Sequence, residues 1–513
     1  MDRYLDIVEV SQKQAYIFSS NHLKDNVLNS ATIAYITSSE YFTEVVKDEN
    51  LYSESKNMVF SGGGHTVLEF PSIDAARKFN AIVTASIHSR YPRILIFTRI
   101  IQYDEKKTPG QNIKDLTTKL EEKKSIRSAY FHQGTFGIED IDTNTLLPKS
   151  AKKEEAEIPE SERKIDRAII PGGYESVSKF GDLGGSEGEA NFIAVVHIDG
   201  NGMGNRVKRF YENNSDKTWE EFKELASKFS KSIDKDFKEA FAEMNSVVAR
   251  RLQEKKLEEL DIKNRDFPVR RIISSGDDIC FVTDGRIGVE CAAEFIKALI
   301  KKENTADCES YSACAGVVIV HSKFPFFRAY EIAEALCSNA KRYGASLSPK
   351  DNGACVSAID WHIEYGELGD SLGDIRKDYR SMDDGYLNLR PYIVDAPEDV
   401  FNKDLNRNYE SFRKLMRMLR DDKDAYSGGT LKNMRNVLKQ GEKATEYYLK
   451  FHNVYGLAMK SYQGIFTPID YSGIGKGEAL EKKIFIETYG GTKHAILFDA
   501  IELLDCYLFL GDI

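Results

Sequence analysis

The sequence predicts an α+β protein made of two similar β-α-β-β-α-β units and a helical C-terminal domain. The chain has 513 residues, of which 41% are hydrophobic and 30% charged, as expected for a globular protein with several cores. Strand-like apolar runs and helical periodicity alternate in the same order in two places. After about residue 395 the patterns are helical only. We therefore expect two sheets followed by a mainly helical region.

The first unit is predicted from five segments of the N-terminal part. Residues 4–10 read as a strand, and a helical region rich in Ala, Ile and Tyr follows. Residues 58–70 contain a Gly-rich turn between apolar runs and predict a hairpin. A helix over 74–87 and a strand over 93–101 complete the unit.

The second unit repeats this order with a strand at 192–200, a helix from 220 into the 250s, a hairpin at 269–283, a helix at 288–300 and a strand at 311–320. The order is that of the ferredoxin-like split unit, in which an antiparallel sheet carries helices on one face. The turns S-G-G-G-H and S-S-G-D-D occupy the same point of the two units. This favours duplication, although a common fold used twice by chance gives the same pattern.

Composition divides the chain into four regions: a first unit (1–110), a connecting region (111–190), a second unit (191–360) and a C-terminal, mainly helical domain (361–513). Within the connecting region, the charged stretch 150–164 and the Gly-rich stretch 179–190 read as linker or exposed loop. The C-terminal domain is predicted from four helical patterns, at 409–420, 431–440, 444–455 and 494–510.

Charge and cysteine usage exclude several classes of protein. The net charge of −10 argues against a broad non-specific nucleic-acid-binding face, but leaves a local basic groove open. The seven cysteines form no C-x-x-C pair, so neither a zinc site nor a disulfide framework is indicated. No apolar run is long enough to span a membrane, and the N-terminus has no leader pattern. We expect a cytoplasmic protein without membrane contacts.

Three carboxylates are the main candidates for chemistry. The first strand and the hairpin of such a unit are neighbours, so Asp199 should approach Asp277 and Asp278. Converging carboxylates repel each other unless cations separate them, and hard oxygen ligands suit Mg²⁺ or Mn²⁺. Two such ions are predicted, which favours nucleotidyl transfer. The alternative is that the Asp doublet only stabilises a β-turn.

A Gly-rich turn follows Asp199 directly. Gly200, Asn201 and Gly202 belong to the run D-G-N-G-M-G between an apolar strand and a predicted helix. Backbone N–H groups in such a turn can hold phosphate, although many Gly-rich turns are only tight connections. Its position beside the Asp doublet favours the phosphate interpretation.

These motifs resemble a known family. D-G-N-G-M-G (199–204), F-P-V-R-R-I-I-S-S-G-D-D (267–278) and the segment from Ser312 to Lys341 resemble the palm domain of the large polymerase-like subunit of type III CRISPR systems, which is related to GGDEF and nucleotidyl cyclases. V-S-Q-K-Q-A-Y-I-F-S-S-N-H-L-K-D (10–25) and S-G-G-G-H are similar to the first palm of that family. The C-terminal helices resemble its closing domain less specifically.

The resemblance implies that the second palm, with its GGDD-type hairpin, joins ATP into cyclic oligoadenylates, second messengers of antiviral defence. It implies that Asp199 and Asp278 hold the two Mg²⁺ or Mn²⁺ ions and that Asp277 completes the cluster or orients the attacking hydroxyl. The remaining expected nucleotide contacts are Gly200, Asn201 and Gly202 on phosphate, Ser275 and Gly276 on the nucleotide face of the hairpin turn, Lys341 on the triphosphate, and Gly62, Gly63 and Gly64 in the first palm. For Lys341, a solvated lysine on a helix face is an equal alternative.

Some features depart from the family pattern. Ser275 replaces the first glycine of the GGDD motif, and we expect activity to survive because serine is small. The sequence has no His-Asp doublet and no cysteine-based ribbon in 131–148. The resemblance therefore implies neither the family's HD nuclease nor its zinc ribbon. It leaves a standalone role open. Gly64 and His65 take the carboxylate positions of the first palm and Glu9 takes that of Asp199, which predicts a degenerate palm.

Two other functions remain open at this point. The protein could make a cyclic dinucleotide or a linear nucleotide conjugate, or it could be a non-catalytic scaffold that senses nucleotide or RNA. The expected partners are nucleoside triphosphates, with RNA or CRISPR effector subunits as candidates and a downstream effector that senses a cyclic nucleotide. Ring size, linkage, base preference, activating signal and oligomeric state are not predicted.

Overall fold

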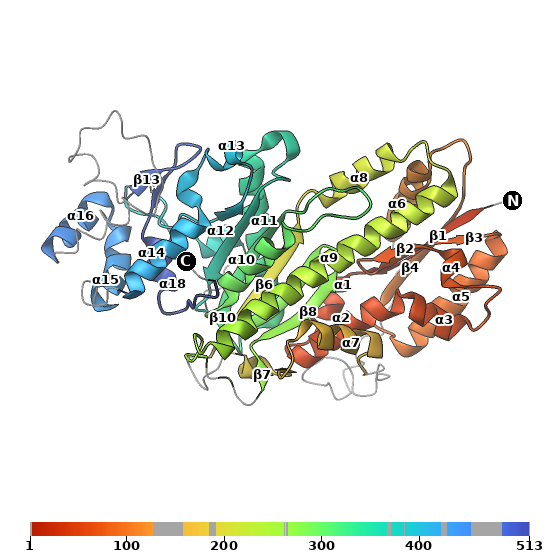
Figure 1. Cartoon of the computed structure of the whole chain (residues 1–513), viewed down its shortest axis with the longest axis horizontal. Helices are drawn as coiled ribbons and strands as arrows, with labels where there is room; N and C mark the ends of the chain where they lie inside the picture. The colour runs from red at the N-terminus through yellow and green to blue at the C-terminus, as the bar shows by residue number, and fades with distance from the viewer. Residues whose placement is uncertain are drawn as a thin grey trace.

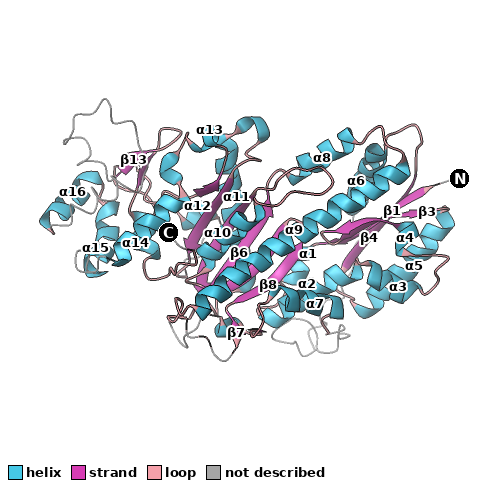
Figure 2. Ribbon diagram, in the orientation of Figure 1, coloured by secondary structure: helices cyan, strands magenta, loops and turns pink. Residues whose placement is uncertain are grey.

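A computed structural model describes residues 3–126, 157–183, 191–260, 262, 265–366, 371–383, 385–421, 428–452 and 485–511. Residues 131–148, where the sequence predicts that the family's zinc ribbon is missing, lie outside the described residues. Two sheets with their helices are aligned along the long axis of the molecule, and the C-terminal helices lie at one end (Figure 1). Figure 2 shows the strands of both sheets with helices around them. In the described part, no helix is long and apolar enough to cross a membrane.

The first unit contains the predicted four-stranded sheet, in the order β2-β3-β1-β4. Its strands are β1 (Tyr4–Ser11), β2 (Met58–Gly62), β3 (His65–Phe70) and β4 (Leu95–Gln102). Its helices are α1 (Lys13–Ile17), α2 (Leu23–Ile36), α3 (Ser39–Val46), α4 (Glu54–Asn57), α5 (Ile73–Arg90) and α6 (Pro109–Ser125). The strand order and the antiparallel pairing confirm the ferredoxin-like unit.

The second unit has the same four-stranded arrangement, and two further strands extend its sheet to the order β12-β11-β10-β6-β9-β8. The strands are β6 (Phe192–Gly200), β8 (Val269–Ser275), β9 (Asp278–Asp284), β10 (Ala313–His321), β11 (Ser357–Ile363) and β12 (Tyr392–Asp395). The helices are α8 (Met203–Asn213), α9 (Trp219–Gln253), α10 (Gly288–Leu299) and α11 (Phe326–Leu347). The domain boundary expected at residue 360 thus falls inside β11.

Helices pack on both faces of the second sheet, and not on one face as the sequence predicts, because both sets of alternating side chains are apolar. Val196 and Ile198 of β6 enter one hydrophobic core with α9 and α10. Ile193 and Val195 enter another core with α11. Asp199 is on the α11 face, since it follows Val195 at an even spacing. The polar end of β6 is therefore covered by the C-terminal half of α11.

Helix α9 connects the two units as one long element, about 50 Å in length for its 35 residues. A capping box between Thr218 and Glu221 starts it. Toward its N-terminal end, Ser230 Oγ donates to the carbonyl of Ser61 in β2 (3.1 Å). Further along, α9 packs against α10 (Figure 1). The first hairpin is thus fixed relative to the second unit.

Part of the predicted linker is a helix. Residues Glu160–Ile169 form α7, and a short parallel pair, β5 (Glu175–Ser176) with β7 (Asp266–Phe267), follows. Asp166 of α7 pairs with Arg270 (3.0 Å) and Arg271 (2.8 Å) of β8. These partners, distant in sequence, make an otherwise polar segment helical.

The C-terminal region contains α12 (Leu372–Ile375), α13 (Glu398–Phe401), α14 (Tyr409–Asp421), α15 (Gly428–Lys439), α16 (Glu442–Phe451), β13 (Phe485–Glu487), β14 (Lys493–Ala495) and α18 (Phe498–Leu503). The helix predicted over 494–510 is wrong in extent, since β14 takes its start and only α18 is helical. Buried Asp499 and Glu502 bond Arg390, so the apolar run is packed as a core segment rather than as one amphipathic helix.

Candidate active site

Strand register brings the three predicted carboxylates together. Asp199 is the cross-strand partner of Asp278 in β6 and β9. The Gly200 N–H donates to the Asp277 carbonyl (3.2 Å), and a Cβ built on Gly200 would lie 3.0 Å from Asp277 Cβ. Aspartates from the first strand and from the hairpin therefore meet at one sheet edge, as the sequence predicts.

The doublet has unusual acidity. Burial, with the charge of Asp199 as the next cause, raises the pKa of Asp277 to about 6 and that of Asp278 to about 7. Asp278 has one oxygen, Oδ1, buried without a hydrogen-bond partner, while its side chain as a whole is 40% exposed. One side of this carboxylate thus faces the interior and the other faces solvent.

Lys341 supplies the positive charge in this arrangement. Its Nζ lies 2.5 Å from Asp199 Oδ2 and 2.9 Å from the Gly200 carbonyl. Although burial acts in the opposite direction, Asp199 raises the pKa of Lys341. The lysine therefore contacts the carboxylate cluster directly instead of lying on a solvated helix face.

The donor set fits hard divalent cations. In the described segments, no three His, Cys, Asp or Glu side chains already stand as a metal-ligand set. However, Asp278 Oδ1 is buried without a partner, and the raised pKa values of the doublet reflect carboxylates that burial and mutual repulsion destabilise. Carboxylate oxygens in an open cluster are what Mg²⁺ and Mn²⁺ prefer. Asp199, Asp277 and Asp278 are the residues that would hold them.

The Gly-rich turn is shaped by its neighbours. Gly202 has a φ of +63°, and a Cβ there would lie 2.9 Å from Ala354 Cβ, so only glycine fits. The Asn201 N–H donates to the Ser312 carbonyl, and Asn201 Nδ2 donates to the Val356 carbonyl (2.7 Å). With the Gly200 amide also used, the N–H groups left for phosphate are those of Gly202 and of the first turn of α8.

The backbone of the hairpin turn favours glycine at only one of its two positions, Ser275 and Gly276. Gly276 has a φ of +64°, whereas Ser275 is not among the residues with a positive φ. Ser275 pairs with Asp278 as the last residue of β8. The left-handed φ therefore favours glycine at the second position of this turn and not at the first.

The first unit has an equivalent site without the carboxylate pair. Glu9 pairs with His65 across β1 and β3, in the register that Asp199 and Asp278 have in the second unit. Lys124 Nζ lies 2.7 Å from Glu9 Oε1 and occupies the position in α6 that Lys341 occupies in α11, counted from the first residue of each helix. Burial and the nearby lysines lower the pKa of His65 to about 4. This site therefore presents a neutral imidazole where the second unit has an aspartate.

The Gly-rich hairpin of the first unit is largely covered. A Cβ on Gly64 would lie 3.0 Å from Lys13 Cε, and one on Gly62 would lie 3.4 Å from Ser230 Oγ. Lys13 Nζ also donates to the carbonyl of Gly63. A nucleotide would reach this backbone only at Gly63 or after Lys13 moves.

Contacts between the two units include residues that sequence reasoning missed. Gln14 Nε2 donates to Tyr330 Oη (3.0 Å) and to Glu334 Oε1 (3.1 Å). Burial lowers the pKa of Lys13, and Asp278 of the second unit partly opposes this shift. His197 was also missed, although its position two residues before Asp199 places both side chains on one face.

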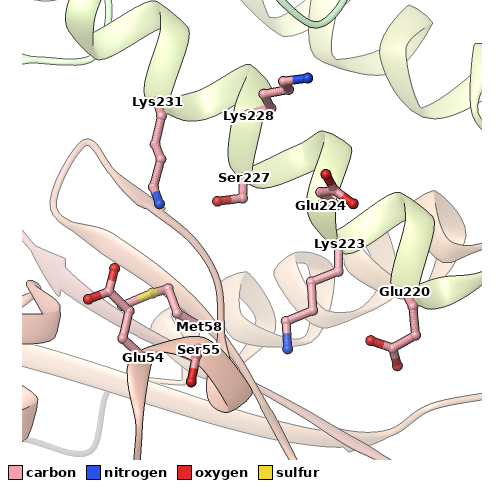
Figure 3. A pocket seen from close by; sticks show the side chains of 9 residues that line it. All are labelled: Glu54, Ser55, Met58, Glu220, Lys223, Glu224, Ser227, Lys228 and Lys231. Atoms are coloured by element: carbon pink, nitrogen blue, oxygen red, sulfur yellow. The ribbon is translucent and has the colours of Figure 1, made fainter.

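A well-defined pocket lies away from the carboxylate cluster. A cavity of about 790 Å³ lies between α9 and the α4–β2 segment and is lined by Glu54, Ser55, Met58, Glu220, Lys223, Glu224, Ser227, Lys228 and Lys231 (Figure 3). Its lysines and glutamates nearly balance, and none of the predicted site residues lines it. The carboxylate cluster is an open edge rather than an enclosed pocket.

Comparison with known proteins decides the family of the second unit. Residues 192–348 match the family model described as "Cas10/Cmr2, second palm domain". The chain carries a Cas10-like second palm. No curated protein matches the chain significantly.

Solved structures have the same fold at low sequence identity. A chain of the Csm1–Csm4 cassette in complex with cA3 matches with a TM-score of 0.56 and 14% identity, over 99% of this chain and 70% of that chain. The cassette in complex with one ATP gives 0.53 and 15%, over 99% and 70%. The Csm1–Csm4 subcomplex in the type III-A CRISPR-Csm interference complex gives 0.53 and 15%, over 98% and 70%.

The chain thus has the fold of these solved chains, and its two units are called the first palm (the first unit) and the second palm (the second unit). The chain spans about two thirds of the length of the solved chains, with 65% of the chain in the apo cassette covered.

Proposed function

We propose that this protein is a nucleotidyltransferase that joins ATP into a cyclic oligoadenylate, with the second palm as its catalytic centre. The observation that carries the proposal is the contrast between two sites of the same register. The second palm pairs Asp199 with Asp278, whereas the first pairs Glu9 with His65. A scaffold has no physical need for a cluster whose carboxylates raise each other's pKa.

In the proposed reaction, the 3′-hydroxyl of one ATP attacks the α-phosphorus of another, a phosphodiester forms and pyrophosphate leaves. Mg²⁺ or Mn²⁺ held by Asp199, Asp277 and Asp278 would lower the pKa of the attacking hydroxyl and neutralise charge on the leaving group. The first-turn amides of α8 face the phosphates. Asp277 orients the attacking hydroxyl.

Lys341 is proposed to change partners during this reaction. In the structure its ammonium neutralises Asp199 (2.5 Å). When cations take over that role, Lys341 is released toward the triphosphate, which remains within reach because the side chain lies at the same edge. Lys341→Met should therefore raise the KM for ATP more than it changes metal affinity.

The acceptor ATP is proposed to lie between the two palms. Lys13 and Lys124 of the first palm lie close enough to affect the pKa of His65, and Lys13 also interacts with Asp278. The degenerate palm thus offers cations at a site where the second palm offers anions. Phosphate would be attracted to the first and metal to the second.

We further propose that the protein works with a CRISPR effector subunit. The structural relatives are chains of Csm1–Csm4 cassettes, one of them within an interference complex. RNA binding would then depend on the partner, since the net charge of this chain is −10.

The test is product analysis by mass spectrometry after incubation with each nucleoside triphosphate and Mg²⁺ or Mn²⁺. Cyclic oligoadenylate and pyrophosphate are expected from ATP. A cyclic dinucleotide or a linear conjugate would correct the product while keeping the chemistry. A wild-type protein that binds nucleotide but is as inert as Asp277→Ala/Asp278→Ala in all conditions, including with a partner subunit and RNA, would refute catalysis.

A further inference from the structure

His197 and Asp278 each have one buried side-chain atom without a hydrogen-bond partner, and these two atoms lie near each other. Register places Asp199 opposite Asp278 and His197 opposite Cys280, so His197 and Asp278 are diagonal neighbours on the α11 face. His197 Nδ1 lies 3.5 Å from Asp278 Oδ1. Both atoms are buried, and neither has a hydrogen-bond partner in the structure. Such atoms are costly to leave unpaired, and a small rotation of the carboxylate would join them.

The imidazole ring is held in place by a chain of contacts. It packs edge-on against Tyr330 of α11, with ring centroids 5.4 Å apart. The Tyr330 ring packs on Phe18 of the first palm (4.1 Å), and its hydroxyl accepts from Gln14 (3.0 Å). His197 itself is only 7% exposed. The ring therefore cannot turn away from Asp278 without disturbing the contact between the palms.

The orientation of Asp278 follows from this arrangement. With Oδ1 buried beside His197 and the side chain 40% exposed, Oδ2 is the oxygen at the open edge near Asp199. A hydrogen bond to Oδ1 would fix the carboxylate in this orientation. Partners of this kind behind a ligating carboxylate are a general means of orienting it.

We propose that His197 is a positioning residue for Asp278: its Nδ1–H donates to Oδ1 and keeps Oδ2 directed at the reaction site. The proposal rests on the proposed function of the second palm. His197 touches neither substrate nor cation in this account. It acts only through Asp278, and through Tyr330 and Gln14 it links the orientation of Asp278 to the first palm.

Three variants separate positioning from packing. His197→Phe keeps a ring against Tyr330 but removes the donor. His197→Asn loses most of the ring but places an amide nitrogen close to the position of Nδ1. His197→Gln places its amide near the position of Nε2 instead. If His197 only packs against its neighbours, His197→Phe should lose least relative to wild type. If His197 positions Asp278, His197→Asn should lose least.

The first readout is the dissociation constant of Mn²⁺ in the absence of nucleotide, measured by electron paramagnetic resonance. We expect His197→Phe and His197→Gln to weaken binding about tenfold, and His197→Asn to stay within about threefold of wild type. Thermal unfolding checks that each variant is folded. Wild-type affinity in His197→Phe, or equal losses in the Phe and Asn variants, would overturn the proposal.

The second readout does not depend on activity or on metal. With histidine labelled with ¹⁵N, the His197 signal among the nine histidines is assigned by its absence in His197→Phe. At about pH 8 we expect Nδ1 to carry the proton and Asp278→Ala to shift that signal. A proton on Nε2, with Nδ1 bare, would overturn the proposal whether or not the protein makes a product. Conversely, the expected tautomer in a catalytically inert protein would refute only the proposed function.

Discussion

Protons and divalent cations should compete for the Asp277–Asp278 pair. Burial and the charge of Asp199 raise the pKa of these carboxyls to about 6 and about 7. A carboxyl with such a raised pKa is still partly protonated near neutral pH, and each proton must leave before the oxygen can bind metal. Metal affinity should therefore fall as the pH is lowered, in a range where an ordinary carboxylate would be fully ionised.

The size of the effect follows from the two pKa values. At about pH 6, proton competition weakens binding by a factor of about 11 at Asp278 and about 2 at Asp277, whereas at about pH 8 both factors are close to 1. The predicted loss of Mn²⁺ affinity between these pH values is about 20-fold, or about 1.8 kcal/mol. Because the two groups interact, the loss belongs to the pair and not to either residue alone.

Isothermal titration calorimetry in buffers of different ionisation enthalpy measures both the affinity and the number of protons released. The matched control is Glu9→Gln, which changes the equivalent position of the first palm and should leave affinity and pH dependence unchanged. Asp199→Asn should weaken binding at every pH. An affinity that changes less than about threefold between the two pH values would refute the reasoning, as would an equal effect of Glu9→Gln and Asp199→Asn.

Three further predictions concern stability. Asp166→Ala leaves the buried guanidinium of Arg271 with one carboxylate fewer. It should therefore lower the free energy of unfolding, measured by urea titration, by about 3 kcal/mol. A loss under about 1 kcal/mol would contradict this. Gly202→Ala should lower the free energy of unfolding by about 1–3 kcal/mol, because the left-handed φ and the contact with Ala354 both disfavour a side chain. An unchanged urea midpoint would contradict this. Burial raises the pKa of Asp6, so the folded state holds this proton more tightly than the unfolded chain, and the free energy of unfolding should fall as the pH rises above about 4. Asp6→Asn should remove this part of the pH dependence, and identical pH profiles of the variant and the wild type would contradict the assignment.

The four strands of each β-α-β-β-α-β unit could be predicted because their side-chain alternation and Gly-rich turns are local signals. The hairpins at 58–70 and 269–283 were found for this reason, and with them the meeting of Asp199 with the Asp doublet. The C-terminal boundary at 360 was not predictable in the same way. Strand β11 pairs in parallel with β10, and such pairing is decided by tertiary contacts rather than by local sequence.

In two places, contacts with residues distant in sequence decide the structure, and the local sequence pattern does not reveal it. The charged stretch 150–164 predicts a linker or exposed loop, yet its last residues belong to α7, where Glu162 and Asp166 pair with arginines of β8. His197 was passed over because a histidine within an apolar strand reads as core. Its relation to Asp278 requires the register of β6 and β9, which the sequence implied only through the Asp199 pairing.

We propose that the second palm, and not the first, carries out nucleotidyl transfer. The most direct test compares wild type, Asp199→Asn and Glu9→Gln in an assay of pyrophosphate release and product mass with ATP and Mn²⁺. We expect oligoadenylate from wild type and from Glu9→Gln, and a loss of activity of at least about 100-fold in Asp199→Asn. Equal activity in wild type and Asp199→Asn, or a loss confined to Glu9→Gln, would contradict it.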